Sequence, residues 1–102
     1  MGENNRNVSQ TIGATSAQIA PELMPGERYV ISIVNTSVGG QVISISIGQE
    51  AVAGVGIVLN PSGSWQESVD SAFRPTEKGF WAVSSAAGGT LAIHERIVIK
   101  GA

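Results

Sequence analysis

The chemistry open to this chain is limited by its single histidine and its lack of cysteine. His94 lies in a segment where strand alternation would point it away from the face of Leu91 and Ile93. One imidazole without thiolates cannot form a zinc site of the Cys or His type. A serine hydrolase triad would need Asp70, the only aspartate, beside His94, and no Gly-x-Ser-x-Gly segment is present. We therefore expect no catalytic residue and no metal site.

The remaining carboxylates and the paired glycines are equally unsuited to known reaction chemistry. Glu67 and Asp70 are three residues apart, which on a strand places them on opposite faces, so they would not flank one glycosidic bond. Gly54 and Gly56 lack the third glycine and the following helix that a dinucleotide site needs. One aspartate is too few for a calcium loop. These patterns predict a protein that is not an enzyme and has no cofactor.

Four of the five aromatic residues fall between positions 65 and 81. Phe80 and Trp81 are adjacent on an expected strand, so they face opposite sides and only one of them can join the main core. The other would meet a neighbouring subunit, a carbohydrate stacked on an indole, or a loop folded over it. Phe73 and Arg74 are of types enriched at protein interfaces. The residues that we expect at an interface are Arg6, Val8, Trp65, Phe73, Arg74, Phe80 and Trp81.

Alternation of apolar and polar residues indicates the elements that must position these side chains. The chain has 102 residues, enough for one domain, and 42% of them are hydrophobic. Strands are predicted at residues 28–34, 42–47, 57–59, 65–69, 80–84 and 90–99, with shorter alternating stretches at 8–12 and 17–19. No segment shows helical periodicity. The expected fold is all-β: a single antiparallel β-sandwich, jelly-roll-like or Ig-like, or a small barrel, of seven or eight short strands.

The polar N-terminus, the glycine content and the lack of disulfides bear on domain organisation and assembly. We expect a flexible N-terminal arm over residues 1–10, which either frays or becomes ordered on a partner, and a β-sandwich domain over residues 11–102. The chain has 13 glycines and no disulfide, so additional area buried between subunits would stabilise it. This predicts a homo-oligomer, with a trimer favoured over a pentamer and a monomer as the alternative.

The charge pattern excludes two classes of partner. Six Lys and Arg against eight Asp and Glu give a net charge of −2, and no basic patch appears that would bind nucleic acid or anionic lipid. No apolar run reaches the roughly 18 residues of a membrane span. The first ten residues also do not have the pattern of a secretory signal.

Five short motifs carry a resemblance to a known class of proteins. They are VNTS at 34–37, VISISIG at 42–48, GIVLNPSGS at 56–64, GFWAVS at 79–84 and GTLAIHE at 89–95. Together they resemble small structural proteins of tailed bacteriophages, in particular head-decoration modules of the virion surface. The resemblance implies a non-enzymatic protein that binds the major capsid protein as a symmetric oligomer on the capsid surface. The alternative is a carbohydrate- or receptor-binding β-sandwich module that uses Trp65 or Trp81 as a stacking platform.

Overall fold

The computed structural model describes residues 2–70 and 72–99, and all regular elements within them are β-strands. In chain order the strands are β1 (Gly2–Ile12), β2 (Ala17–Ala20), β3 (Arg28–Asn35), β4 (Ile43–Ile47), β5 (Ile57–Leu59), β6 (Ser64–Ser68), β7 (Phe80–Ser84) and β8 (Gly89–Ile99). The described residues contain no helix that is long and apolar enough to cross a membrane.

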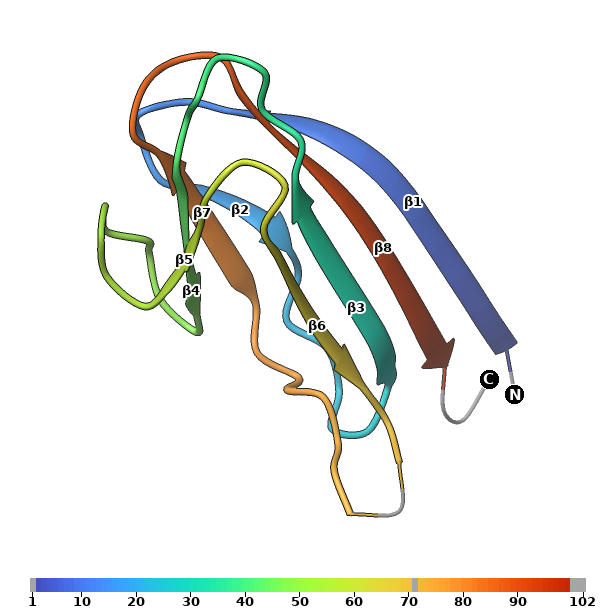
Figure 1. The fold of residues 1–102 in the computed structure, drawn as a ribbon. Coiled ribbons are helices and arrows are strands. Elements are labelled where there is room, and N and C mark those ends of the chain that lie inside the picture. Colours follow the sequence, from blue (N-terminus) through green and yellow to red (C-terminus); the bar gives the residue numbers. More distant parts are fainter. Residues whose placement is uncertain (1, 71, 100–102) are drawn as a thin grey trace.

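Two four-stranded antiparallel sheets form the fold. The first, sheet A, has the order β1-β8-β3-β6, and the second, sheet B, has the order β2-β7-β4-β5. Figure 1 shows the two sheets and the long antiparallel pair formed by β1 and β8. This strand order is that of a jelly roll, in which consecutive strands alternate between the two sheets except for β4 and β5, which pair with each other in sheet B. The predicted antiparallel β-sandwich of seven or eight strands is therefore confirmed.

The hydrophobic core lies between the sheets and is supplied by alternate residues of each strand. In β4, Ile43 and Ile45 are fully buried on the inner face, as their β-branched alternation with serine predicts. Phe80 on β7 is also fully buried. The core residues are Ile12, Ile19, Ala20, Ile31, Ile33, Ile43, Ile45, Leu59, Phe80, Ala82, Leu91 and Ile93.

The loop between β4 and β5 covers part of the outer face of sheet B. The backbone amide of Gly54 donates a hydrogen bond to Ser44 Oγ (2.8 Å), and the amide of Ala51 donates to Ser16 Oγ (2.9 Å). Ser44 and Ser46 are consequently buried, at 2% and 8% exposure, although they point away from the core. The serine face of β4 therefore does not form part of the open surface.

The N-terminal residues are part of the sandwich, which differs from the expected mobile arm over residues 1–10. Residues 2–12 form β1, and each of them is paired with a residue of β8 without a register shift. The outward side chains of β1 are polar because they face solvent. Two of its inward side chains, Arg6 and Gln10, are polar as well, because this strand lies at the edge of the sheet. Alternation in β1 is therefore weak in the sequence, which predicts a strand only over its last part, residues 8–12.

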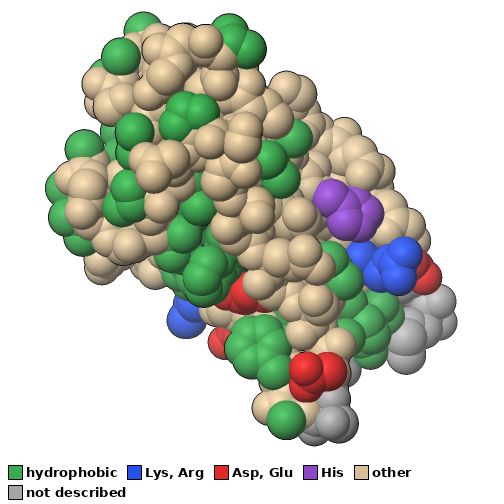
Figure 2. Space-filling model, in the orientation of Figure 1, with side chains coloured by type: hydrophobic (Ala, Val, Ile, Leu, Met, Phe, Trp, Pro, Cys, Tyr) green, Lys and Arg blue, Asp and Glu red, His purple; other side chains and the backbone are tan. Residues whose placement is uncertain are grey.

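Charge is distributed unequally along the molecule. Four loops meet at one end, residues 13–16, 36–42, 60–63 and 85–88, and none contains Asp, Glu, Lys or Arg; we call this the uncharged end. Asn35, which is 1% exposed, links two of these loops through its side-chain amide, which donates to the carbonyl oxygens of Gln41 in the 36–42 loop and of Leu59 just before the 60–63 loop. Figure 2 shows charged side chains only in the lower half of the visible face.

Candidate functional site: buried ion network and exposed surfaces

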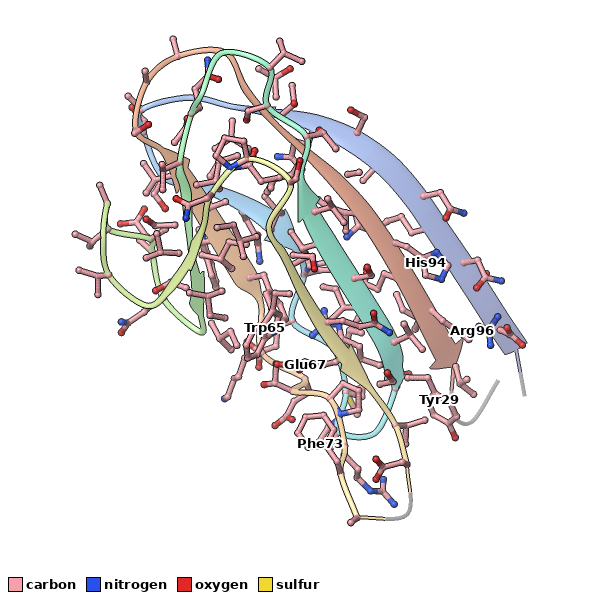
Figure 3. The ribbon with its side chains drawn as sticks, viewed as in Figure 1. Tyr29, Trp65, Glu67, Phe73, His94 and Arg96 are labelled. Atoms are coloured by element: carbon pink, nitrogen blue, oxygen red, sulfur yellow. The ribbon has the colours of Figure 1, made fainter. Side chains whose placement is uncertain are left out.

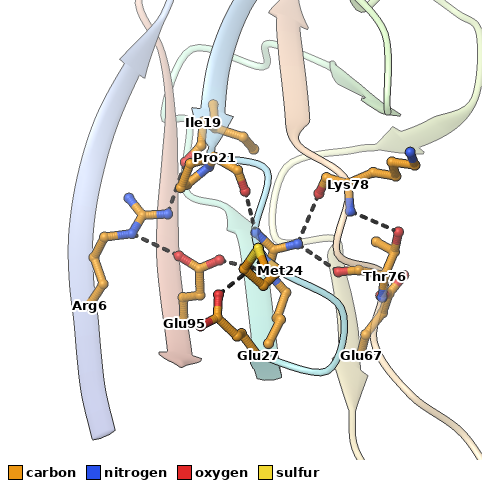
Figure 4. A network of polar contacts seen from close by, with 10 residues as sticks. Arg6, Ile19, Pro21, Met24, Glu27, Glu67, Thr76, Lys78 and Glu95 are labelled. Atoms are coloured by element: carbon orange, nitrogen blue, oxygen red, sulfur yellow. Dashed lines mark hydrogen bonds and ion pairs between the residues drawn. The ribbon is translucent and has the colours of Figure 1, made fainter. Parts of the chain in front are cut away.

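The guanidinium of Arg28 is buried and held by hydrogen bonds from all three of its nitrogens. Its side chain has no exposed surface, and its Nε donates to Glu95 Oε2 at 2.7 Å. Its Nη1 donates to the carbonyl oxygens of Thr76 and Lys78, and its Nη2 donates to that of Pro21. These contacts are drawn in Figure 4. Arg28 therefore ties the β2–β3 and β6–β7 loops to the inner face of sheet A.

Arg28 reaches this position because of an irregularity in β3. Arg28 faces Ile97 of β8 while Val30 faces Arg96, so Tyr29 is an extra residue at this point. This bulge turns Arg28 to the same inner side as Ile31. The guanidinium also lies 5.2 Å from the ring centroid of Phe80, a cation–π contact with a core side chain.

A second arginine completes the network at the edge of the sandwich. Arg6 on β1 donates from Nε to Glu95 Oε1 (2.9 Å) and from Nη2 to the carbonyl oxygen of Ile19 on β2 (3.0 Å). Glu95 is fully buried and so has a different arginine on each of its two oxygens. Because Arg6 bridges sheet A and sheet B, it links the edge strand β1 to the opposite sheet.

The neighbouring acidic residues serve the folding of the β6–β7 loop. Glu67, which is 7% exposed, accepts hydrogen bonds from the Trp65 indole nitrogen (3.1 Å) and from the Thr76 amide (3.1 Å). Asp70 accepts from the amides of Ala72 and Phe73 through Oδ1. Glu67 and Asp70 are thus occupied by structural contacts and do not face one substrate.

The expected interface residues do not form one continuous surface. Arg6 and the half-exposed Val8 lie on β1, whereas Trp65 lies on β6 at the opposite edge of the same sheet. Phe73, 47% exposed, and the exposed Arg74 lie on the β6–β7 loop. The positions of Trp65 and Phe73 are labelled in Figure 3.

The alternative between Phe80 and Trp81 is resolved by the structure. Phe80 is fully buried, so including it among the interface residues was wrong: its side chain fills the core and contacts Arg28. Trp81 points to the outer face of sheet B and is half-buried. Trp65 points to the inner side at the edge of sheet A, since it pairs with the core residue Ile33. The two indoles therefore do not share one stacking platform.

The outer face of sheet A contains a shallow hollow of about 370 Å³ with a polar row of residues. Asn7, His94 and Ser32 lie directly opposite one another on β1, β8 and β3, and all three line the hollow. Asn7 Oδ1 lies 2.7 Å from His94 Nδ1. Val34 and Ala92 complete much of the lining, so the floor of the hollow is formed largely by small side chains.

The Asn7–His94–Ser32 row lacks the features that acyl transfer requires. The partner of His94 is the neutral amide of Asn7 and not Asp70, so no buried carboxylate supports an imidazolium. β8 is hydrogen-bonded to a strand on both sides, so its amides are occupied and cannot form an oxyanion hole there. Among the described residues, no three His, Cys, Asp or Glu side chains come together as metal ligands.

The clearest exposed apolar cluster was not recognised in the sequence. Val52, Val55 and Val58 are 59%, 53% and 44% exposed, and we call them the valine patch. The Val55 amide donates to the Val52 carbonyl, which closes a turn between them. Val58 faces Ser44, the residue that holds the same loop. The sequence of residues 50–56 does not decide between a strand and a loop. The only sequence feature that sets this region apart is that Glu50 is its single charged residue.

The buried network was also missed, although the sequence contains a signal for it. Leu91, Ile93 and Ile97 share one face of a strand, and strand alternation places Glu95 on that same face. A carboxylate in phase with core residues must have a charged or hydrogen-bonding partner. The partners themselves, Arg6 and Arg28, are 89 and 67 residues away along the chain.

Comparison with known proteins supports the fold. No family model matches the chain, and no curated protein matches it. Among solved structures, it is similar to a chain from the work described as "Bacillus endospore appendages form a novel family of disulfide-linked pili", with a TM-score of 0.56 and 20% sequence identity. The alignment covers 97% of this chain and 88% of the other. At this identity the likeness establishes a shared fold.

Two differences follow from this match. The appendage proteins are described as disulfide-linked, whereas this chain has no cysteine and cannot form such a link. The match is to an appendage protein, so the bacteriophage-specific part of the expected function gains no support from it. What the match and the expected function have in common is the β-sandwich fold.

Proposed function

We propose that this chain is a non-enzymatic structural subunit that assembles with copies of itself. The observation that carries the proposal is the valine patch, three exposed valines on a part of the surface that is nearly free of charge. Contiguous exposed apolar side chains mark interaction sites, and the centres of interfaces are depleted of charged residues. Between Tyr29 and Gln66 the only charged residue is Glu50.

The disposition of the ionisable groups supports the same proposal. Arg28, Glu67 and Glu95 are buried in contacts that hold loops and strands together. His94, the only imidazole, is bound to a neutral amide on an open sheet face. These side chains stabilise the sandwich, and the surface that is left suits contacts between subunits.

Two kinds of assembly are compatible with this proposal. In the first, a symmetric oligomer, with a trimer favoured, binds the major capsid protein and decorates a virion, as the sequence motifs imply. In the second, the chain polymerises by itself into an extracellular appendage, the kind of assembly named for the structural neighbour. Electron microscopy of the purified chain, compared with co-sedimentation on candidate empty shells, separates the two forms.

The proposal is tested by placing charge on the valine patch. In a variant with both Val52→Asp and Val55→Asp, the assembled mass should fall below that of the unmodified chain at concentrations where the unmodified chain is assembled. Val69→Asp is the matched control, because Val69 is 38% exposed and lies beyond β6, away from the patch. Far-UV circular dichroism checks that the variants are folded. An assembled mass that is equal in the double variant and the control would contradict the role of the patch.

A further inference from the structure

Strand β1 has a long backbone edge that no strand of residues 2–70 or 72–99 covers. Its eleven residues pair with β8 on one side, and β1 is the outermost strand of sheet A. Such an edge leaves backbone N–H and C=O groups ready to pair with another strand. The other outer strands are shorter: β6 has five residues, β2 has four and an irregular register, and β5 has three. Among the described strands, β1 therefore has the longest edge that is free to pair with another strand.

β1 also lacks the features that usually protect a long edge. It contains no proline, and its register with β8 has no bulge. Its inward charge, Arg6, is neutralised by the buried Glu95 and bound to the Ile19 carbonyl. Its exposed side chains include Asn5, Asn7 and Ser9, which are short and polar and suit hydrogen bonds across a strand pair.

We propose that β1 pairs antiparallel with β1 of a second copy of this chain, about a two-fold axis through Asn7. The inference rests on the proposed self-assembly and names one of its contacts. With the axis at Asn7, all eleven residues of β1 have a partner, and Asn5 faces Ser9 of the second copy. Moving the axis by one residue in either direction leaves two residues unpaired. The two four-stranded sheets become one continuous sheet across the axis.

The charges on β1 are compatible with this register. Glu3 faces Thr11 of the second copy and Arg6 faces Val8, so no like charges lie directly opposite. The two Arg6 residues lie on a diagonal about 7–8 Å apart, and each is already paired with its own Glu95. An axis at Arg6 would instead place two guanidinium groups face to face, which is unfavourable. Charge therefore favours Asn7 over Arg6 as the position of the axis.

The proposed β1 contact is separate from the valine patch. A two-fold contact is made by the same surface on both copies and closes after two subunits. Growth beyond a pair needs a different surface. The valine patch lies on β5 and the loop before it, and β5 is the outer strand at the far edge of sheet B from β2. The two surfaces can therefore be occupied at the same time.

Introduced cysteines test the register directly, because the chain has none of its own. Asn7→Cys would place two thiols opposite each other, with Cβ atoms about 4.5–5.5 Å apart, and mild oxidation should give a disulfide-linked dimer. Asn5→Cys alone and Ser9→Cys alone put like thiols four residues apart along the strand, about 14 Å, which exceeds the limit of about 7 Å between Cα atoms for a disulfide. An equimolar mixture of these two variants should instead give the mixed dimer. All three positions are exposed on the same strand, so they are matched.

A charge variant gives a second readout without oxidation. Asn7→Lys places two ammonium groups at the axis, whereas the control Ser9→Lys places each one opposite Asn5. We expect the dissociation constant of the pair to rise about tenfold or more in Asn7→Lys relative to Ser9→Lys. Equal constants in the two variants would overturn the proposed register.

The outcomes separate this inference from the proposed function. Fast cross-linking of Asn7→Cys and of the mixture, with slow cross-linking of each control, supports β1 pairing. If the unmodified chain assembles but Asn7→Cys cross-links no faster than Ser9→Cys, the β1 inference is overturned and self-assembly stands. If the unmodified chain is a monomer at every concentration, both are overturned. Specific pairing of β1 with another protein in place of a second copy would also refute the inference.

Discussion

The buried ion network makes a quantitative prediction about stability. Glu95→Gln keeps the shape of the side chain but removes the negative charge that lies between Arg6 and Arg28. After the change, Arg28 keeps its hydrogen bonds to the neutral carbonyl oxygens of Thr76, Lys78 and Pro21 in the two adjacent loops. The guanidinium of Arg28 would then be a buried cation without its counter-ion, and this should strongly destabilise the fold.

The expected magnitude follows from burial. Removing one partner of a buried ion pair typically costs about 3–5 kcal/mol, and both Glu95 and Arg28 have no exposed side-chain surface. For a domain of about 100 residues, 1 kcal/mol corresponds to about 4–8 °C in the unfolding midpoint. Glu95→Gln should therefore lower the midpoint by at least about 12 °C.

The matched control is the same substitution in an exposed ion pair. Glu3 Oε2 lies 3.2 Å from Arg96 Nε, and the side chains of Glu3 and Arg96 are 52% and 49% exposed. Exposed pairs contribute about 0–1 kcal/mol, so Glu3→Gln should change stability little. Urea unfolding followed by far-UV circular dichroism, at one fixed subunit concentration, measures both. A Glu95→Gln loss no larger than that of Glu3→Gln would refute the reasoning.

Two further predictions concern packing and backbone conformation, and both are measured by urea unfolding. Phe80→Ala should lower the free energy of unfolding by about 3–5 kcal/mol, because the ring is fully buried. Phe73 is 47% exposed, so Phe73→Ala should change it by less than about 1 kcal/mol. Equal losses in the two variants would contradict the assignment of Phe80 to the core. Gly56→Ala should destabilise more than Gly54→Ala, because both have positive φ but only at Gly56 would the new Cβ lie 2.8 Å from the Ile45 carbonyl oxygen. A smaller loss of stability in Gly56→Ala than in Gly54→Ala would contradict the expected clash with the Ile45 carbonyl oxygen.

The central strands could be predicted from the sequence because they are buried on one face and flanked by turns. The alternation of isoleucine and serine at 43–47 and the apolar stretch at 80–84 correspond to β4 and β7. The turn at 60–63 forms as expected, with Ser62 in the left-handed region at φ 70°. Where burial on one face is strong, period-two alternation locates the strand.

The edge strand and the contacts distant in sequence could not be predicted in the same way. β1 has polar residues on both faces, because Arg6 and Gln10 point inward but bond to polar groups of β8 and β2. Strand formation there depends on pairing with β8, at the other end of the chain. The valine patch could not be predicted from the sequence either, because the loop that carries it becomes an exposed surface only when β4 and β5 pair.

The most direct test of the proposed self-assembly is the mass of the unmodified chain in solution, measured by sedimentation velocity over a wide concentration range. The account predicts species that are multiples of the 10.5 kDa subunit and that grow with concentration. A single 10.5 kDa species at every concentration would contradict it.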